Sequence, residues 1–252
     1  MLALLTLLAG TALAEAPPPP DASPSPVSSG DRRTGPFSRD TYPSEVSARP
    51  LALPAGMFRA DAALEVDYFR LAPTTTWQAL PGLSGAYGLT DGLELGALAA
   101  FALSPAAARR VGASCTLLLI DGASLDMALQ AGLELNLSGV VPALEIGVAF
   151  PGRLLLDDRF FLTFGAELFR LRLAPLFPQG ALKLGLGAQV TPGVAILAET
   201  DVAKLLLRTL PLELAVTVAV ARGFDLRVRA QAVSLTYPRL AGAFTLAGSA
   251  YF

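Results

Sequence analysis

Residues 124–137 read SLDMALQAGLELNL, and this stretch decides the fold. Every second residue, from Leu125 to Leu137, is leucine, methionine or alanine, whereas the residues between them are polar or small. A two-residue alternation puts the two sets on opposite faces of a β-strand, and a helical period does not produce it. The stretch therefore predicts a strand with one apolar face and one polar face.

Four other stretches alternate in the same way, at 58–68, 181–190, 212–221 and 225–231. Five tight-turn signals occur at intervals of 30, 36, 35 and 31 residues, centred on Asp91, Asp121, Asp157, Pro192 and Gly223. Each interval fits two strands that are long enough to cross a bilayer when tilted, together with one short connection. Twelve strands are expected, with ten as the alternative because 76–89 and 240–252 alternate weakly; the expected ranges are 57–69, 76–89, 92–103, 109–120, 123–137, 141–154, 159–172, 180–191, 193–204, 210–222, 224–236 and 240–252.

Composition indicates which face of these strands meets lipid. The chain has 252 residues, of which 53% are hydrophobic and only 16% are charged, too few charges for the exterior of a soluble barrel. No window after the N-terminus has the uncharged apolar length of a membrane helix. The bulky face therefore points to lipid and the small or charged face to a wet lumen. The predicted fold class is all-β, a transmembrane antiparallel up-and-down β-barrel.

Three segments with different compositions follow one another along the chain. Residues 1–14, MLALLTLLAGTALA, are expected to be an export signal peptide, because an apolar run ends in an A-x-A pattern. Residues 15–50 are rich in Pro and Ser and are expected to form a disordered periplasmic tail, either a plain linker or a tether. The barrel is expected over residues 51–252. The composition of the tail does not require it to enter the lumen, and the outer connections are too short to form a plug.

The chain resembles Gram-negative outer-membrane β-barrel proteins in its export signal, its alternating strands and its last strand, GAFTLAGSAYF, which ends in Phe252. The resemblance implies that Phe252 is part of the signal read by the barrel-assembly machinery. The stretch Tyr87–Gly96, YGLTDGLELG, is similar to a strand–turn–strand motif of transporter-like barrels linked to aromatic-compound degradation. That similarity covers one hairpin and assigns no substrate-binding residues.

Projecting the alternation across the strands predicts the side chains that line the lumen. The acids outnumber the bases by about seven when Arg59 is counted among the bases, so a channel here is expected to prefer cations weakly. Arg170 and Arg172 have the opposite parity to Glu167, and either a strand bulge near Leu168 or a strand end above the membrane would explain this. The predicted lumen-lining residues are Asp61, Glu65, Asp67, Glu94, Arg110, Asp126, Glu134, Glu145, Glu167, Lys183, Glu199, Asp201, Glu213, Asp225, Arg227 and Arg229.

Two functions remain open at this point. One is passive passage of small solutes through the polar lumen, and the other is a closed structural or assembly barrel whose charges pair with one another. An enzyme is not expected, because the chain has no histidine to activate a serine and its single cysteine, Cys115, shares the apolar face. No metal or cofactor is expected. The expected partners are outer-membrane lipid, the barrel-assembly machinery and small solutes, but not nucleic acid, since the net charge is −2.

Overall fold

The computed structural model describes residues 41–71, 74–103, 106–137, 142–173, 176–202, 211–234 and 239–252. The expected signal peptide, and the expected tail as far as residue 40, lie outside these residues. Within the described part of the chain, no helix is long and apolar enough to span a membrane.

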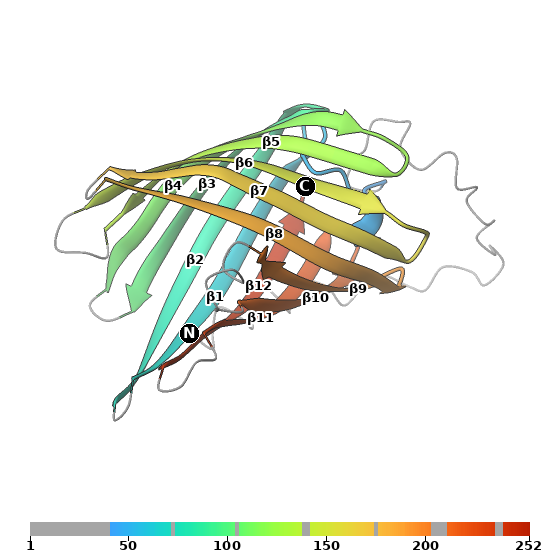
Figure 1. Ribbon diagram of the computed structural model, residues 1–252. Coiled ribbons are helices and arrows are strands. Elements are labelled where there is room, and N and C mark those ends of the chain that lie inside the picture. The colour runs from blue at the N-terminus through green and yellow to red at the C-terminus, as the bar shows by residue number, and fades with distance from the viewer. Residues whose placement is uncertain are drawn as a thin grey trace, which may run out of the picture. The chain divides into compact units, whose positions relative to one another are not determined.

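Twelve antiparallel strands form one closed barrel, in which each strand pairs with its neighbours in sequence and β1 pairs with β12 (Figure 1). The prediction of twelve strands is confirmed, and the ten-strand alternative is excluded. The strands are β1 Phe58–Leu71, β2 Thr74–Thr90, β3 Leu93–Leu103, β4 Ala106–Asp121, β5 Leu125–Asn136, β6 Ala143–Leu155, β7 Phe160–Leu173, β8 Leu176–Thr191, β9 Val194–Asp201, β10 Leu212–Ala221, β11 Phe224–Ser234 and β12 Arg239–Tyr251.

All five expected tight turns connect consecutive strands, and they lie at the same end of the barrel as the last residue, Phe252. We call this end the turn end. The turn between β10 and β11 is made by Arg222 and Gly223, and Gly223 has a φ of 72°, in the left-handed region that favours glycine. The barrel closes beside it, where Phe58 and Phe252 exchange backbone N–H···O bonds of 3.0 and 2.8 Å.

The outer surface of the barrel carries large apolar side chains. Leu184, Leu214 and Leu246 are 49%, 48% and 41% exposed, as a face directed at lipid requires. Trp77 and Tyr68 pack against each other with ring centroids 4.6 Å apart, near the end opposite the turns. Tryptophan and tyrosine favour the boundary between lipid and water, so this pair suits one interface of the membrane.

Of the two explanations for the parity of Arg170 and Arg172, the structure shows the first, a β-bulge in β7. Ala149 of β6 pairs with Glu167, but the preceding residue, Val148, pairs with Phe169, so Leu168 is the extra residue. Beyond the bulge, Arg170 and Arg172 are in register with Gly147 and Glu145. The alternation of β7 is thereby shifted by one residue, which accounts for two arginines whose parity differs from that of Glu167.

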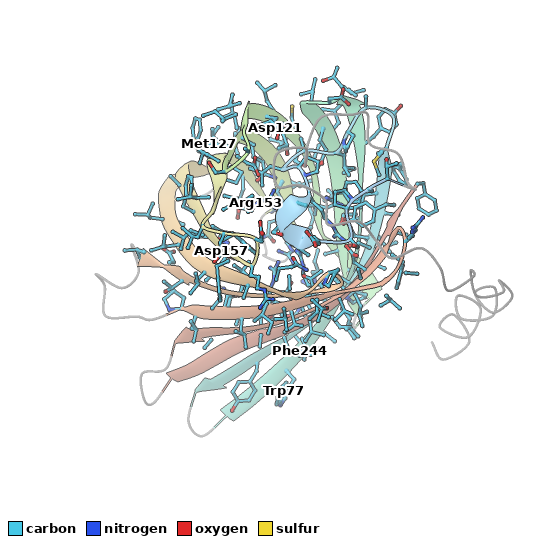
Figure 2. All side chains as sticks on the ribbon, turned by 90° about the vertical axis from the view of Figure 1, so that its right-hand side faces the viewer. Trp77, Asp121, Met127, Arg153, Asp157 and Phe244 are labelled. Atoms are coloured by element: carbon cyan, nitrogen blue, oxygen red, sulfur yellow. The ribbon has the colours of Figure 1, made fainter. Side chains whose placement is uncertain are left out.

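One short 3-10 helix, η1 Val46–Ala48, precedes the barrel. It belongs to a segment, residues 42–57, that packs against the inward side of the wall at the turn end; we call it the inner segment. In Figure 2, which looks at the turn end, this segment lies within the ring of strands, whereas Trp77 and Phe244 lie on the outside. Residues 41–50, expected from their composition to belong to the disordered tail, lie in an ordered stretch that includes η1.

Candidate functional site

The inner segment is held by ion pairs and hydrogen bonds from four sides of the barrel. Arg49 forms a two-pronged ion pair with Asp225 of β11, in which Nη2 lies 2.9 Å from Oδ1. Its guanidinium also lies 5.4 and 5.5 Å from the ring centroids of Tyr42 and Tyr251. Burial acts to lower the pKa of Arg49, but the hydrogen bonds that its guanidinium donates to Asp225 help to raise that pKa overall.

Arg153 of β6 holds the segment from the opposite side of the ring. Its Nη1 donates to the carbonyl of Val46 at 2.8 Å, and its Nη2 donates to the carbonyl of Arg49. Asp126 of β5 fixes the same guanidinium through contacts of 2.7 and 3.2 Å. Figure 2 shows Arg153 pointing inward toward η1. Asp126 is only 1% exposed, so it is an internal support for the arginine rather than a hydrated lumen group.

The hairpin Tyr87–Gly96, singled out by resemblance, receives the second half of the inner segment. The amide N–H of Leu53 donates to Glu94 Oε2 at 2.8 Å, and that of Ala55 donates to Asp91 Oδ1 at 3.1 Å. The N–H of Gly56 donates to the carbonyl of Gly88 at 2.8 Å. The motif therefore binds this segment, through Gly88, Asp91 and Glu94. Its sequence indicated a hairpin and gave no sign of what the hairpin would bind.

An apolar cluster completes this attachment. Leu53, Met57, Ala86 and Tyr251 are 2%, 3%, 3% and 7% exposed, and Tyr42 packs against them. The rings of Tyr42 and Tyr251 are 4.8 Å apart. Burial raises the pKa of the Tyr42 hydroxyl above its ordinary value, and the neighbouring Tyr251 adds to the shift. Both ends of the segment thus lie at the turn end.

A cavity of about 570 Å³ lies inside the barrel beyond the inner segment. Val46 and Leu51 of the segment border it on one side, and residues of nine strands, β3 to β11, form the rest of its wall. The wall combines small residues with seven of the charged residues predicted for the lumen: Glu134, Glu145, Lys183, Glu199, Glu213, Arg227 and Arg229.

The charges around this cavity are only partly paired. Arg229 Nε lies 2.9 Å from Glu213 Oε1, and the Thr163 hydroxyl donates to Glu199 at 3.0 Å. Two pairs of carboxylates stand directly opposite each other on adjacent strands, Glu134 with Glu145 and Glu199 with Glu213. Like charges in this position are unfavourable in a sheet unless cations offset them. Arg229 pairs with Glu213, and Arg172 is in register with Glu145.

The remaining predicted residues occupy other places. Asp61 contacts Arg59 Nε at 3.1 Å and accepts a bond from the Ser84 hydroxyl at 3.0 Å. Glu65 of β1 reaches Arg110 of β4 at 3.5 Å.

Asp201 is buried, opposite Lys183 in the register. Asp67 pairs with Gln78 in the register, on the same face as Glu65. The side chain of Glu167 lies outside the described part of the structure.

Two arginines of this site were missed from the sequence. Arg153 has the parity of Glu145 on the same strand, so the alternation alone could have assigned it to the inward face. Arg49 could not have been found, because it lies in a Pro/Ser-rich stretch without periodicity. Both arginines are paired with acids, Asp126 and Asp225, that contribute to the expected acid excess. The acid excess of the lumen is therefore smaller than the expected seven.

The fold is that of the outer-membrane channel barrels. Among solved structures, the chain is similar to a KdgM porin (10% identity, TM-score 0.52, 75% of this chain and 99% of that one). It is also similar to the COG4313 outer membrane channel from Pseudomonas putida F1 (12%, 0.54, 80% and 97%) and to the NanC porin (5%, 0.50, 75% and 98%). No protein-family model and no curated protein matches the sequence. At these identities the likeness extends to the fold.

Proposed function

We propose that this protein is a channel of the bacterial outer membrane that lets small solutes pass passively. The observation that carries the proposal is the combination of a closed barrel, an apolar outer face and a charged internal cavity of about 570 Å³. Charged side chains such as Glu134 and Glu145 on the cavity wall favour a hydrated interior over one filled by apolar side chains.

In this proposal the turn end faces the periplasm, because short turns lie on that side of outer-membrane barrels. The N-terminal part of the chain would then start from the periplasm, after removal of residues 1–14 as a signal peptide. Phe252 would serve the barrel-assembly machinery as part of its recognition signal. The proposed role is transport rather than catalysis, and it involves no cofactor or nucleic acid.

The proposed pathway runs through the cavity and past the inner segment. Solutes would meet Glu134, Glu145, Glu199 and Glu213 on the cavity wall, so the channel would favour cations modestly. The inner segment would set the size limit at the turn end, since Val46 and Leu51 border the cavity there.

A second candidate function, a closed structural barrel, is favoured by one specific observation. At the turn end, the charged side chains of Arg153 and Asp225 bind the inner segment. A segment fixed in this way would block the lumen permanently.

Conductance of the refolded protein in planar bilayers distinguishes the two functions. A channel would give discrete conductance steps and, under a salt gradient, a reversal potential showing cation preference. Replacing Glu134 and Glu145 by glutamine would move that potential toward zero, whereas Asp158→Asn, in an exposed turn, would leave it unchanged. Folded, inserted protein that stays silent, even at high voltage, would support the closed barrel instead.

A further inference from the structure

The two halves of the inner segment are attached to the barrel by different kinds of contact. Residues 53–57 run into β1 and share backbone bonds with β2, including Gly88 N–H to the Met57 carbonyl at 2.9 Å. The contacts of residues 46–49 with the wall instead include a side chain on at least one side. Arg49 pairs with Asp225, and the Ser47 N–H donates to Gln189 Oε1 at 3.3 Å. The first half, residues 42–50, can therefore leave the wall while the second half remains in place, provided that Tyr42 also gives up its packing on Tyr251.

Most wall residues that hold the first half would keep a partner if it left. Arg153 would retain Asp126, at 2.7 Å, and Gln189 would retain the carbonyl of Thr191, which its Nε2 already contacts at 2.6 Å. Asp225 differs, because the partner that it would retain, the hydroxyl group of Tyr251, carries no charge. Asp225 is 4% exposed, and among the described residues Arg49 is its one ion-pair partner. Departure of Arg49 would leave a carboxylate without a counter-charge in a confined place, which is costly.

Arg227 is placed to supply that counter-charge. It follows Asp225 by two residues on the same face of β11, a distance of about 6.6 Å along a strand. In the described structure its Nε contacts only the Thr217 hydroxyl, at 3.2 Å, and it has no ion pair. The same spacing already supports an ion pair in this barrel, because Arg59 contacts Asp61 at 3.1 Å on β1. Asp61 and Asp225 lie in the same row, each opposite Ser249 of β12.

We propose that Arg227 is the alternative ion-pair partner of Asp225. When Asp225 exchanges Arg49 for Arg227 as its partner, residues 42–50 are released and the turn end of the lumen opens. This inference rests on the proposed channel function for its biological meaning, although the exchange itself is a property of the chain. Arg227 acts as a positioning residue, since it stabilises the open barrel without touching the segment.

Thiol labelling of the inner segment tests the exchange without any transport measurement. Ser47 is 3% exposed, so a thiol introduced there is protected while the segment is bound. In a Cys115→Ser background, the barrel carrying Ser47→Cys is refolded in lipid and its reaction with a membrane-impermeant maleimide is timed. Ala48→Cys, at a second buried position, repeats the measurement independently. Heat-modifiable gel migration confirms that each variant is folded.

Each variant has a definite expected result. Arg49→Ala should speed labelling about tenfold or more, because a tenfold change needs only about 1.4 kcal/mol. Arg227→Gln should slow labelling severalfold, and Arg227→Lys should restore most of the rate. Arg229→Gln is the matched control: it removes the same charge two residues further along, where the guanidinium is already paired with Glu213, and should change little. In an Asp225→Asn background, Arg227→Gln should have no effect.

Two results would overturn the proposal that Asp225 exchanges Arg49 for Arg227. The first is a labelling rate that Arg227→Gln leaves unchanged, or changes no more than Arg229→Gln does. The second is complete protection of the thiol introduced by Ser47→Cys in every variant, including Arg49→Ala, which would show that the segment never leaves. If labelling follows the expected pattern but the bilayers stay silent, the exchange stands and the channel function is rejected.

Discussion

Gly88 lies so close to Pro54 that a Cβ added to Gly88 would stand 2.0 Å from the Pro54 carbonyl oxygen, and 2.6 Å from that of Leu53. The inner segment therefore passes over the wall of the barrel at a place where only glycine leaves room for it. The backbone of the segment and the backbone of β2 are in direct contact there, and the hydrogen bonds of Gly88 with Gly56 and Met57 depend on it.

Gly88→Ala should accordingly dislodge the inner segment while leaving the barrel intact. We expect heat-modifiable migration to be retained and the segment to become sensitive to protease, because the clash is with backbone that cannot rotate away. The matched control is Gly82→Ala on the same face of β2, where a Cβ would meet its nearest neighbour at an ordinary 3.6 Å. Equal protease resistance in both variants would contradict the close approach.

Removing Asp126 should destabilise the barrel strongly. Asp126→Ala leaves the Arg153 guanidinium, itself 5% exposed, without its carboxylate, and breaking such a buried pair costs about 3–5 kcal/mol. Denaturant unfolding in lipid measures the loss. The double variant Asp126→Leu/Arg153→Met should recover part of it, and a double variant less stable than Asp126→Ala would rule out the charge as the cause.

Asp157 should make the turn between β6 and β7 sensitive to acid. Its Oδ1 accepts backbone bonds from Phe160 at 2.6 Å and Arg159 at 2.7 Å, and these bonds lower the pKa of the carboxyl group. Because the folded pKa lies below the unfolded one, the contribution is present above the ordinary pKa of aspartate and is lost as the pH falls through the lowered value.

Amide hydrogen exchange at Phe160, measured as a function of pH and corrected for intrinsic rates, reports this loss. Protection should fall on acidification in the parent protein. In Asp157→Asn, which keeps an acceptor oxygen but does not titrate, protection should stay level over the same range. A parallel fall in both proteins would assign the effect to another group.

Leu184 and Lys183 offer a direct test of which face meets lipid. They are neighbours on β8 and point to opposite faces, Leu184 outward and 49% exposed, Lys183 to the cavity. Leu184→Arg should reduce the free energy of unfolding in lipid by about 2–4 kcal/mol if the residue lies near the bilayer midplane. Lys183→Arg, which places the same side chain one residue away, should have little effect. Similar losses in the two variants would reverse the assignment of faces.

Sequence alone predicted the barrel well because its two determinants are local. Alternation, as in residues 124–137, assigns each side chain to a face, and turn residues such as Gly223 set the strand ends. The bulge at Leu168 is one of the two explanations that the sequence offers for the parity of Arg170 and Arg172. The inner segment could not be predicted, since residues 42–57 have no period and their contacts are with residues far away in the sequence. Arg49 contacts Asp225 and Tyr251, which are 176 and 202 positions away.

The course of the inner segment has a consequence for how the protein is made. Tyr42 and Met57, at its two ends, pack against the same Tyr251, so the segment enters and leaves by one opening and no part of it is threaded through the ring. The twelve strands can therefore seal in the membrane while the lumen is still empty, with Phe58 meeting Phe252 as the final seam. Closure of the wall and filling of the lumen are thus separable as steps of biogenesis.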